Sequence, residues 1–428
     1  MKPTEYKLLN VADGHILPDE GWTLNDPSSQ SASMVRAIYQ DGKFSPDDSE
    51  DGLYRYHRWM PIKRSLKGSC APVTYKSEAL CSKLGLDNLY LTFSGWNPDR
   101  GAFFKTCSFK ETEAYSVCGR LPSDEKRVLV VASAGNTARA FAHVCSRNGI
   151  PLVICIPADN ISALWFDGPL SSCVKILATP HGSDYFDAIS LGDKLCTDSR
   201  FLPEGGAKNI ARRDGMGTTL LSAVEVLKTI PDFYFQAVGS GTGAIAAWEN
   251  NLRLIGDGSF GTKKMRIMTS QNSPFTIMYD SWALHSRTLV DFPADKARRA
   301  AAEIDAKVLS NRKPPYSLAG GLFDALQDTD GRIYKVTNAE LARWKEIFAE
   351  TEGVDLHNAA AVALASLYAA KRAGEVKKDD IIMLNITGGG EETAKKALGG
   401  RVLYARPDLT IDPSTDASRV VEQVEKLF

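Results

Sequence analysis

The sequence predicts an α/β fold of two lobes, in which twisted, mostly parallel sheets are flanked by helices. Apolar runs alternate with helix-like segments from about Ala71 onward, and three of these runs lead directly into glycine-rich turns. Short runs that are apolar throughout are typical of strands buried on both faces of a parallel sheet. The length of 428 residues suits two lobes better than one small core. The predicted strands are VLVVAS (128–133), PLVICIP (151–157), VKILAT (174–179), FYFQAV (233–238), MRIMTS (265–270) and DIIMLNIT (380–387).

Helices are predicted between these strands. The segment after residues 128–133 has apolar residues at i, i+3, i+4 and i+7 spacing, namely Ala138, Phe141, Ala142 and Cys145. It should end at Asn148-Gly149, because glycine followed by Pro151 stops a helix. The most apolar helical stretch, residues 359–370, is too short to cross a bilayer and is expected to be a buried helix.

Composition excludes several function classes. Hydrophobic residues make up 43% and charged residues 24%, and the net charge is −1, so neither nucleic acid nor a membrane is an expected partner. Residues 1–20 lack the apolar core of a secretory signal, which favours a cytoplasmic protein. The eight cysteines contain no CxxC pair. We therefore expect reduced, mostly buried thiols, with no disulfide and no metal site.

The loops that follow the strands are the candidate sites, since ligands of parallel sheets bind beyond the carboxyl ends of the strands. The first such loop opens a helix and consists of Gly239, Ser240, Gly241, Thr242 and Gly243. Glycines and a helix N-terminus favour a phosphate cradle, with a simple tight turn as the alternative. A dinucleotide loop would need an acidic residue at the end of the next strand, and Thr269-Ser270-Gln271 supplies none.

Two further loops carry polar groups. In residues 132–138, the backbone around Ser133, Gly135 and Thr137 could bind an anion, and Asn136 could donate a hydrogen bond or only cap a helix. In the TGGGEE segment, three consecutive glycines would leave room for a flat ligand beside the Thr387 hydroxyl. A glycine turn without a ligand is the alternative.

Two lysines lie close together before a predicted helix. Ser108 and Glu111 match a capping box, which would start the helix at Ser108 and place Lys110 in its first turn. The positive end of the helix dipole disfavours a cation there, so the Lys110 amine should lose its proton readily, as a Schiff-base lysine must. Lys105 lies in the preceding loop, where anion binding or simple solvation is expected.

These motifs, in this order, resemble those of the fold-type II pyridoxal-phosphate enzymes, which have a tryptophan synthase β-like fold, and most closely those of the threonine synthase group. The resemblance implies that Lys110 binds pyridoxal 5'-phosphate covalently and that Asn136 contacts its ring oxygen. It also implies that the Gly239–Gly243 loop holds the phosphate and that Thr387 faces the pyridine nitrogen. The matching segments are residues 108–110, 132–137, 238–243 and 385–390, with 52–61 and 71–91 upstream.

The chain departs from threonine synthases at two places. Thr106-Cys107 stands where Thr-Gly is usual, and residues 204–217 form a basic loop, EGGAKNIARRDGMG. This combination resembles the cysteate synthases of coenzyme M biosynthesis, which convert O-phospho-L-serine and sulfite into L-cysteate and phosphate by β-replacement. Alternatives are a threonine synthase acting on O-phosphohomoserine and a cofactor-binding protein without catalysis.

The resemblance implies a homo-oligomer. Residues 1–70 are polar, rich in Asp, Ser and Pro, and weakly periodic, so they are expected to form an N-terminal arm or subdomain. A large cofactor-binding domain (71–107 and 215–428) and a small domain (108–214) are expected to make up the rest. A site for two multiply charged anions should contain cationic side chains. Ordinary solvated charge and an anion site of backbone donors are the alternatives. The candidates are Arg100, Lys105, Lys208, Arg212 and Arg213.

Overall fold

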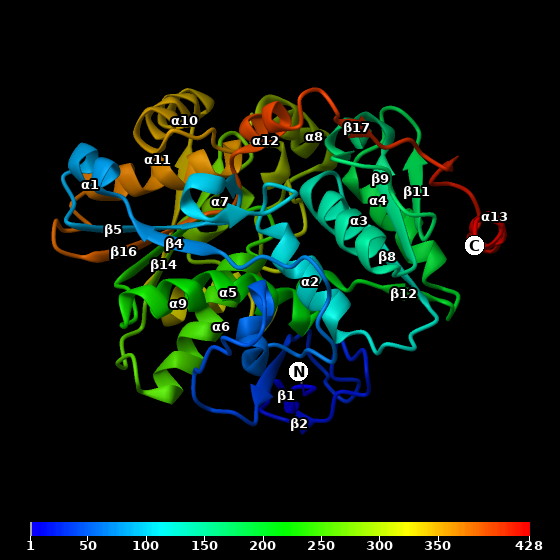
Figure 1. Cartoon of the computed structure of the whole chain (residues 1–428), viewed down its shortest axis with the longest axis horizontal. Helices are drawn as coiled ribbons and strands as arrows, with labels where there is room; N and C mark the ends of the chain where they lie inside the picture. Colours follow the sequence, from blue (N-terminus) through cyan, green and yellow to red (C-terminus); the bar gives the residue numbers. More distant parts are fainter. Residues whose placement is uncertain (1) are drawn as a thin grey trace.

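The computed structural model describes residues 2–428 and contains two principal sheets that lie side by side (Figure 1). The larger has six strands in the order β15-β14-β13-β16-β5-β4. Neighbouring strands are parallel except for β4 and β5, which are antiparallel. The strands are β4 (Val73–Lys76), β5 (Asn88–Phe93), β13 (Phe233–Ala237), β14 (Arg266–Asn272), β15 (Arg332–Val336) and β16 (Ile381–Ile386).

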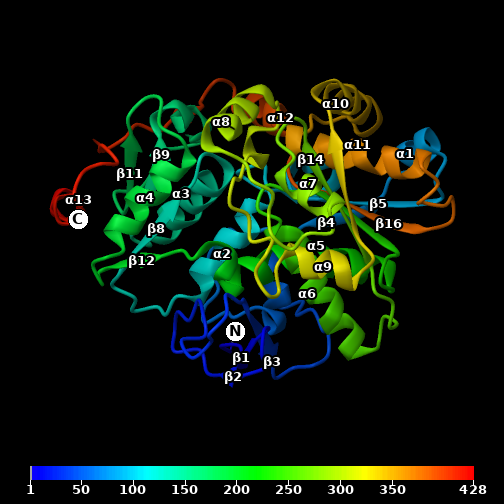
Figure 2. The same ribbon diagram turned by 180° about the vertical axis from the view of Figure 1, so that it is seen from behind.

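Helices cover both faces of this sheet (Figures 1 and 2). One face packs against α11 (Asn358–Arg372), whose alanine-rich surface lets it approach the strands closely, with α10 (Asn338–Glu352) outside it. The other face packs against α5 (Ile210–Leu227), α6 (Thr242–Asp257) and α9 (Leu322–Asp328). Burial on both faces explains why the strands are apolar throughout.

The smaller sheet is parallel, in the order β12-β8-β9-β11-β18. Side chains of β8 alternate: Leu129 and Val131 pack with α3 (Asn136–Asn148), and Val130 packs with α4 (Tyr185–Leu195) and α13 (Ala417–Glu425). The strands are β8 (Val128–Ala132), β9 (Leu152–Pro157), β11 (Val174–Thr179), β12 (Phe201–Pro203) and β18 (Leu409–Thr410).

The predicted fold class is confirmed. All six apolar runs are strands of the two sheets, and residues 359–370 lie in the buried helix α11. Helix α3 ends at Asn148, and Gly149 adopts the left-handed conformation (φ 64°) that favours glycine. The domain division stays a prediction, although β18 and α13, placed with the large domain from sequence, pack with the smaller sheet (Figure 1).

The polar N-terminal region contains a three-stranded antiparallel sheet that its weak periodicity did not reveal. It consists of β1 (Tyr6–Asn10), β2 (Ile16–Leu17) and β3 (Val35–Tyr39). This sheet lies below α5 and α6 in Figure 1, and Tyr39 donates a hydrogen bond to Asp214 of α5.

Shorter elements connect these units, and within residues 2–428 no helix is long and apolar enough to cross a membrane. The helices are α1 (Glu78–Leu84), α2 (Lys110–Arg120), α7 (Ile277–Ala283), α8 (Ala294–Glu303) and α12 (Glu391–Ala397). The 3-10 helices are η1 (Gly52–Trp59), η2 (Pro98–Arg100), η3 (Ala158–Ala163), η4 (Gly206–Lys208) and η5 (Lys307–Leu309). The two-residue strands are β6 (Trp96–Asn97), β7 (Ala102–Phe103), β10 (Trp165–Phe166) and β17 (Leu403–Tyr404).

A substitution at Leu384 tests the packing of the central strand β16. Leu384 is fully buried there and lies opposite Leu91 and Phe235. Leu384→Ala should lower the free energy of unfolding by about 2–5 kcal/mol, because it leaves a cavity in the core. Leu403→Ala, at a side chain that is 47% exposed, should change it by no more than about 0.5 kcal/mol. Urea denaturation measures both; equal effects would contradict this packing.

Candidate active site

The lysine segment lies directly on the turn after the central strand β16. Phe109 N donates a hydrogen bond to Thr387 O (3.0 Å), and Ser108 and Gly388 form an antiparallel bridge. Gly389 N in turn donates to Cys107 O (3.1 Å). The structure therefore brings together the segments of Lys110 and Thr387, which are far apart in sequence.

The three glycines of this turn pack closely against protein atoms on the side where a Cβ would project, and the expected room for a flat ligand beside Thr387 stays a prediction. A Cβ added to Gly388 would lie 2.3 Å from His357 Nδ1, and one added to Gly390 would lie 1.8 Å from Trp96 O. Protein atoms already occupy the space beside the glycines. Their role is to let the lysine segment and the turn pack closely.

The glycine loop after β13 also lies near Lys110. Phe109 packs with Ala246 in the first turns of α6, and α6 begins at Thr242 inside this loop. Ser240 Oγ lies 2.8 Å from Thr242 Oγ1 and accepts a hydrogen bond from Thr242 N (3.3 Å), which shapes the start of the helix. A Cβ on Gly243 would lie 2.6 Å from Gln236 Oε1, so any larger residue here would require the Gln236 side chain to move.

The Ala132–Ala138 turn approaches the same glycine loop from the smaller sheet. Val308 lies between them: a Cβ on Gly135 would be 3.9 Å from Val308 Cγ1, and one on Gly239 would be 2.7 Å from Val308 O. Ser133 Oγ accepts a hydrogen bond from Gly135 N (3.2 Å), so this hydroxyl shapes the turn. Asn136 is the half-buried first residue of α3.

The predicted capping box at the lysine helix is wrong. Helix α2 begins at Lys110 with Phe109 at its N-cap, which provides no side-chain cap. Glu111 instead accepts hydrogen bonds from Thr106 N (2.7 Å) and Thr106 Oγ1 (2.9 Å). This buried carboxylate ties the lysine loop to the helix, and Lys110 is still in the first turn as expected.

Lys110 is surrounded by buried charged groups. Its Nζ lies 3.1 Å from Glu113 Oε2, and the other oxygen of Glu113 lies 3.2 Å from Arg212 Nη2. Burial lowers the pKa of the Lys110 amine, Arg212 lowers it further, and Glu113 opposes both. Burial dominates, so the amine is easier to deprotonate than a surface lysine, which suits nucleophilic attack on an aldehyde.

Only one of the five candidate basic residues contacts this charged group directly. Arg212 does so, and it also pairs with Glu204 (2.6 Å). Arg213, the next residue on α5, is fully buried and bound to other protein groups, and its role as a substrate ligand stays a prediction without support from these contacts. Its guanidinium donates to Glu249 Oε2 (2.9 Å) and to backbone oxygens of Ala207 and Val35.

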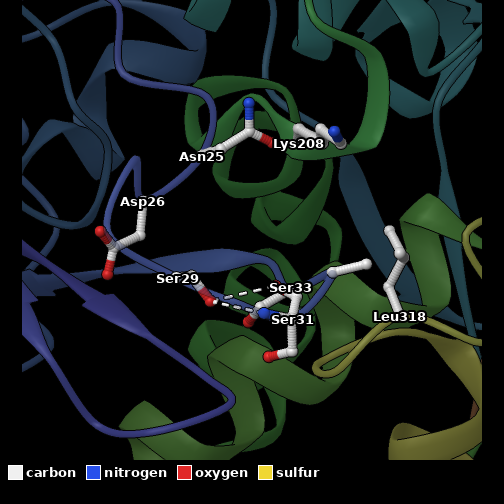
Figure 3. Close-up of a pocket in the computed structure, with 8 residues that line it drawn as sticks. Asn25, Asp26, Ser29, Ser31, Ser33, Lys208 and Leu318 are labelled. Atoms are coloured by element: carbon white, nitrogen blue, oxygen red, sulfur yellow. Dashed lines mark hydrogen bonds between the residues drawn. The ribbon is translucent and has the colours of Figure 1, made fainter.

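The other three candidates lie in different surroundings. Arg100 stacks on Tyr75 (4.4 Å to the ring centroid). Lys105 is half-exposed and lies 3.6 Å from Asp167. Lys208 is exposed and lines a pocket of about 160 Å³ with residues of the N-terminal segment, among them Asn25 (Figure 3).

Cys107 packs inside the protein and does not act as a reactive thiol. Its backbone has φ 52°, a conformation that strains any residue except glycine, at the position where glycine is usual in the resembled family. The side chain is fully buried beside Trp165 and Ala394. Burial raises the pKa of the Cys107 thiol to about 12.

Sequence reasoning missed the residues that organise this site. Glu113 could have been found, because its position three residues after Lys110 places both on one face of a helix. Glu204, which pairs with Arg212, carried no such signal. Arg139 of α3 also escaped notice; it donates to Trp165 O (3.0 Å) and Lys105 O (3.2 Å), and it joins the Asn136 helix to the lysine loop.

The residues at this site fit an aldehyde cofactor that carries a phosphate. Lys110 offers an amine with a lowered pKa, and the start of the 16-residue helix α6 offers unpaired backbone N–H groups behind a glycine loop. The half-buried Asn136 offers a side-chain amide at the start of α3, a group that can hydrogen-bond to a ring substituent.

Comparison with known proteins identifies relatives over nearly the whole chain. The family described as "Pyridoxal-phosphate dependent enzyme" matches residues 75–388. Cysteate synthase of Methanosarcina mazei is 44% identical over 383 residues, covering 89% of this chain and 91% of that protein. Cysteate synthase of Methanocella paludicola is 42% identical over 425 residues, covering 98% of this chain and 97% of that protein.

Solved structures share the fold at low sequence identity. Maize serine racemase has a TM-score of 0.58 and 15% identity, covering 77% of this chain and 91% of that chain. Threonine deaminase isoform 2 from Solanum lycopersicum has a TM-score of 0.54 and 18% identity, covering 77% of this chain and 87% of that chain. These likenesses show the fold.

Arg213→Ala should lower the free energy of unfolding by about 3–5 kcal/mol, because it removes the closer of the two arginines paired with the buried Glu249 carboxylate and the donor to Ala207 O and Val35 O. Lys208→Ala, at an exposed side chain, should change it by no more than about 0.5 kcal/mol. Urea denaturation followed by circular dichroism measures both. A stable Arg213→Ala protein that had lost only substrate affinity would support Arg213 as a substrate ligand.

Cys107 should resist alkylation by iodoacetamide at pH 8 in the folded protein. With a pKa of about 12, about one thiol in 10⁴ is a thiolate at that pH. Peptide mass spectrometry measures the modification, and the protein in urea is the control in which Cys107 reacts. Rapid modification in the folded state would contradict its burial.

Proposed function

Because the chain belongs to the cysteate synthase family of pyridoxal-phosphate-dependent enzymes, we propose that it converts O-phospho-L-serine and sulfite into L-cysteate and phosphate. The chain is an enzyme of the pyridoxal 5'-phosphate class. The observation that carries the substrate proposal is that 42% identity to a cysteate synthase extends over 98% of the chain. The reaction is a β-replacement, in which one anion leaves the β-carbon and another adds there.

The proposed cofactor contacts follow from the loops that meet at Lys110. Lys110 holds the cofactor, the Gly239–Gly243 loop binds its phosphate, and Asn136 binds its ring oxygen. Thr387 offers a neutral hydroxyl to the pyridine nitrogen. The bound cofactor withdraws electrons from the α-carbon of the amino acid substrate. A neutral hydroxyl supports a protonated ring less than a carboxylate does, which favours elimination over transamination.

Lys110 has a second role as the acid and base of the reaction. Once the substrate amine has replaced it, Lys110 Nζ takes the proton from the α-carbon. Phosphate then leaves the β-carbon, sulfite adds there, and the same ammonium returns the proton. Burial lowers the pKa of Lys110, which favours the neutral amine that must accept this proton.

Arg212 is the cation that we propose for binding the anionic substrates. It is the one candidate in contact with the acidic partner of Lys110, and its Nε is buried without a partner within residues 2–428. Backbone N–H groups of the turn containing Ser133, Gly135 and Thr137 would bind the substrate carboxylate. Family resemblance further supports a cytoplasmic homo-oligomer, and light scattering after size-exclusion chromatography measures the assembly.

A product assay tests the reaction. Protein loaded with cofactor receives sulfite with either O-phospho-L-serine or O-phosphohomoserine, and mass spectrometry identifies the amino acids formed. We expect cysteate and an equal amount of phosphate from O-phospho-L-serine. Threonine from O-phosphohomoserine, without cysteate, would instead identify a threonine synthase.

Lys110→Ala should abolish cysteate formation, lowering turnover by a factor of at least about 10³, because it removes both the cofactor attachment and the proton carrier. Lys83→Ala is the matched control, since this lysine of α1 is exposed and belongs to none of the candidate site segments, and it should retain turnover. Substantial activity in Lys110→Ala would overturn the assignment of the lysine.

A further inference from the structure

Lys110 ends a chain of four charged side chains that come from three separate parts of the sequence. Lys110 Nζ contacts Glu113 Oε2 (3.1 Å), and Glu113 Oε1 contacts Arg212 Nη2 (3.2 Å). Arg212 Nη1 continues to Glu204 Oε2 (2.6 Å). Helix α2 thus supplies two groups, α5 supplies the third and the segment after β12 supplies the last.

Because these four charged side chains are largely buried, their net charge affects the pKa of Lys110. The Glu113 side chain is fully buried, and that of Lys110 is 19% exposed. With both carboxylates ionised the four groups sum to zero, and this balance holds only while Lys110 is an ammonium ion. Water screens buried charges weakly, so the neighbours of Lys110 affect its proton strongly.

We propose that Glu113 is a positioning residue for Lys110: its carboxylate receives the ε-ammonium group whenever Lys110 is detached from the cofactor, and Arg212 holds that carboxylate in place. This inference rests on the proposed function through the role of Lys110. It goes beyond that function by assigning the group that accepts the lysine during the part of the cycle when it carries the substrate proton.

The geometry supports this role. Residues three apart on α2 share a face, so the Glu113 carboxylate stays within reach of Nζ when the flexible Lys110 side chain changes rotamer. Arg212 Nη2 forms an ion pair with the far oxygen of Glu113 at 3.2 Å, without hydrogen-bond geometry, and the near oxygen accepts a hydrogen bond from Nζ. Glu111, the other acid of this turn, is the residue next to Lys110 and so does not face it across the helix, and its Oε2 accepts hydrogen bonds from Thr106.

In this proposal, Glu113 compensates the positive charge that proton transfer from the substrate creates on Lys110. The α-carbon–hydrogen bond of the substrate breaks, its electron pair remains with the carbon, and a new N–H bond forms at Lys110 Nζ. The resulting ammonium ion is charged in a buried site beside the cation Arg212. Glu113 compensates that charge at 3.1 Å, and it releases the lysine when the proton returns to carbon.

The groups that face Lys110 give the direction of the expected pH effect. Glu113 and Glu204 raise the pKa of the Lys110 amine, and Arg212 and burial lower it. Tyr185 of α4 faces the same charged groups, and burial raises its pKa, so it stays neutral. Removing the Glu113 carboxylate therefore lowers the pKa of Lys110, and a larger fraction of the amine is neutral at a given pH.

Cofactor loading measures this pKa without the overall reaction. Protein freed of cofactor is mixed with pyridoxal 5'-phosphate over a series of pH values. The imine is reduced with borohydride, and mass spectrometry quantifies the label on the Lys110 peptide. We expect Glu113→Gln to move the midpoint of the initial loading rate at least about one pH unit lower, which means about tenfold more neutral amine at a fixed pH.

Two matched variants distinguish an effect of Glu113 on Lys110 from an effect of the substitution on folding. Glu111→Gln removes a buried carboxylate from the same helix turn and should leave the midpoint at its native value. Glu113→Asp keeps the charge on a shorter side chain, so its midpoint should lie between those of Glu113→Gln and the native protein. If Glu113→Gln does not fold, the test relies on Glu113→Asp alone. A loading midpoint for Glu113→Asp equal to that of the native protein would then overturn the proposal.

Failure of the role proposed for Glu113 and failure of the assignment of Lys110 give different results. A folded Glu113→Gln protein with the native midpoint would overturn the role of Glu113 while leaving Lys110 as the cofactor lysine. Label that persists in Lys110→Ala, attached to another residue, would instead overturn the assignment of Lys110 and with it the inference.

Discussion

The close pairing of the lysine loop with the glycine turn after β16 is the constraint on which the site depends. Backbone hydrogen bonds join Phe109 to Thr387 and Gly389 to Cys107. They hold the first turn of α2 at the carboxyl end of the central strand of the larger sheet. The glycines are required because His357 and the backbone of Trp96 fill the space that side chains would need.

A second set of contacts joins the smaller sheet to the same point. Arg139 of α3 stacks on the Trp165 ring (3.4 Å to the centroid) and lies 3.6 Å from Glu391, which follows the glycine turn. Glu391 also accepts a hydrogen bond from Trp165 Nε1 (2.8 Å). Asn136 and Lys110 therefore share a common support, although they start two different helices.

The buried charges of α5 show why residue type alone does not assign a role. Arg212 and Arg213 are neighbours in sequence, but successive helical residues point about 100° apart, from 3.6 residues per turn. Arg212 joins the charged chain at Lys110, whereas Arg213 binds Glu249 and helps to hold the N-terminal sheet through Val35 O. Both are buried cations, and only their partners distinguish Arg212, a candidate site residue, from Arg213, which forms a structural ion pair inside the protein.

The sequence by itself determined the fold class, the six buried strands and the three loops near Lys110, because apolar runs and glycine-rich turns are local signals. It also placed Lys110 in the first turn of its helix, although the capping box expected there does not form: Glu111 binds Thr106 instead. The tertiary structure alone decided which charges meet. Glu204 reaches Arg212 from a distant segment, and the turn glycines serve close packing, since such contacts depend on how separate elements pack in space.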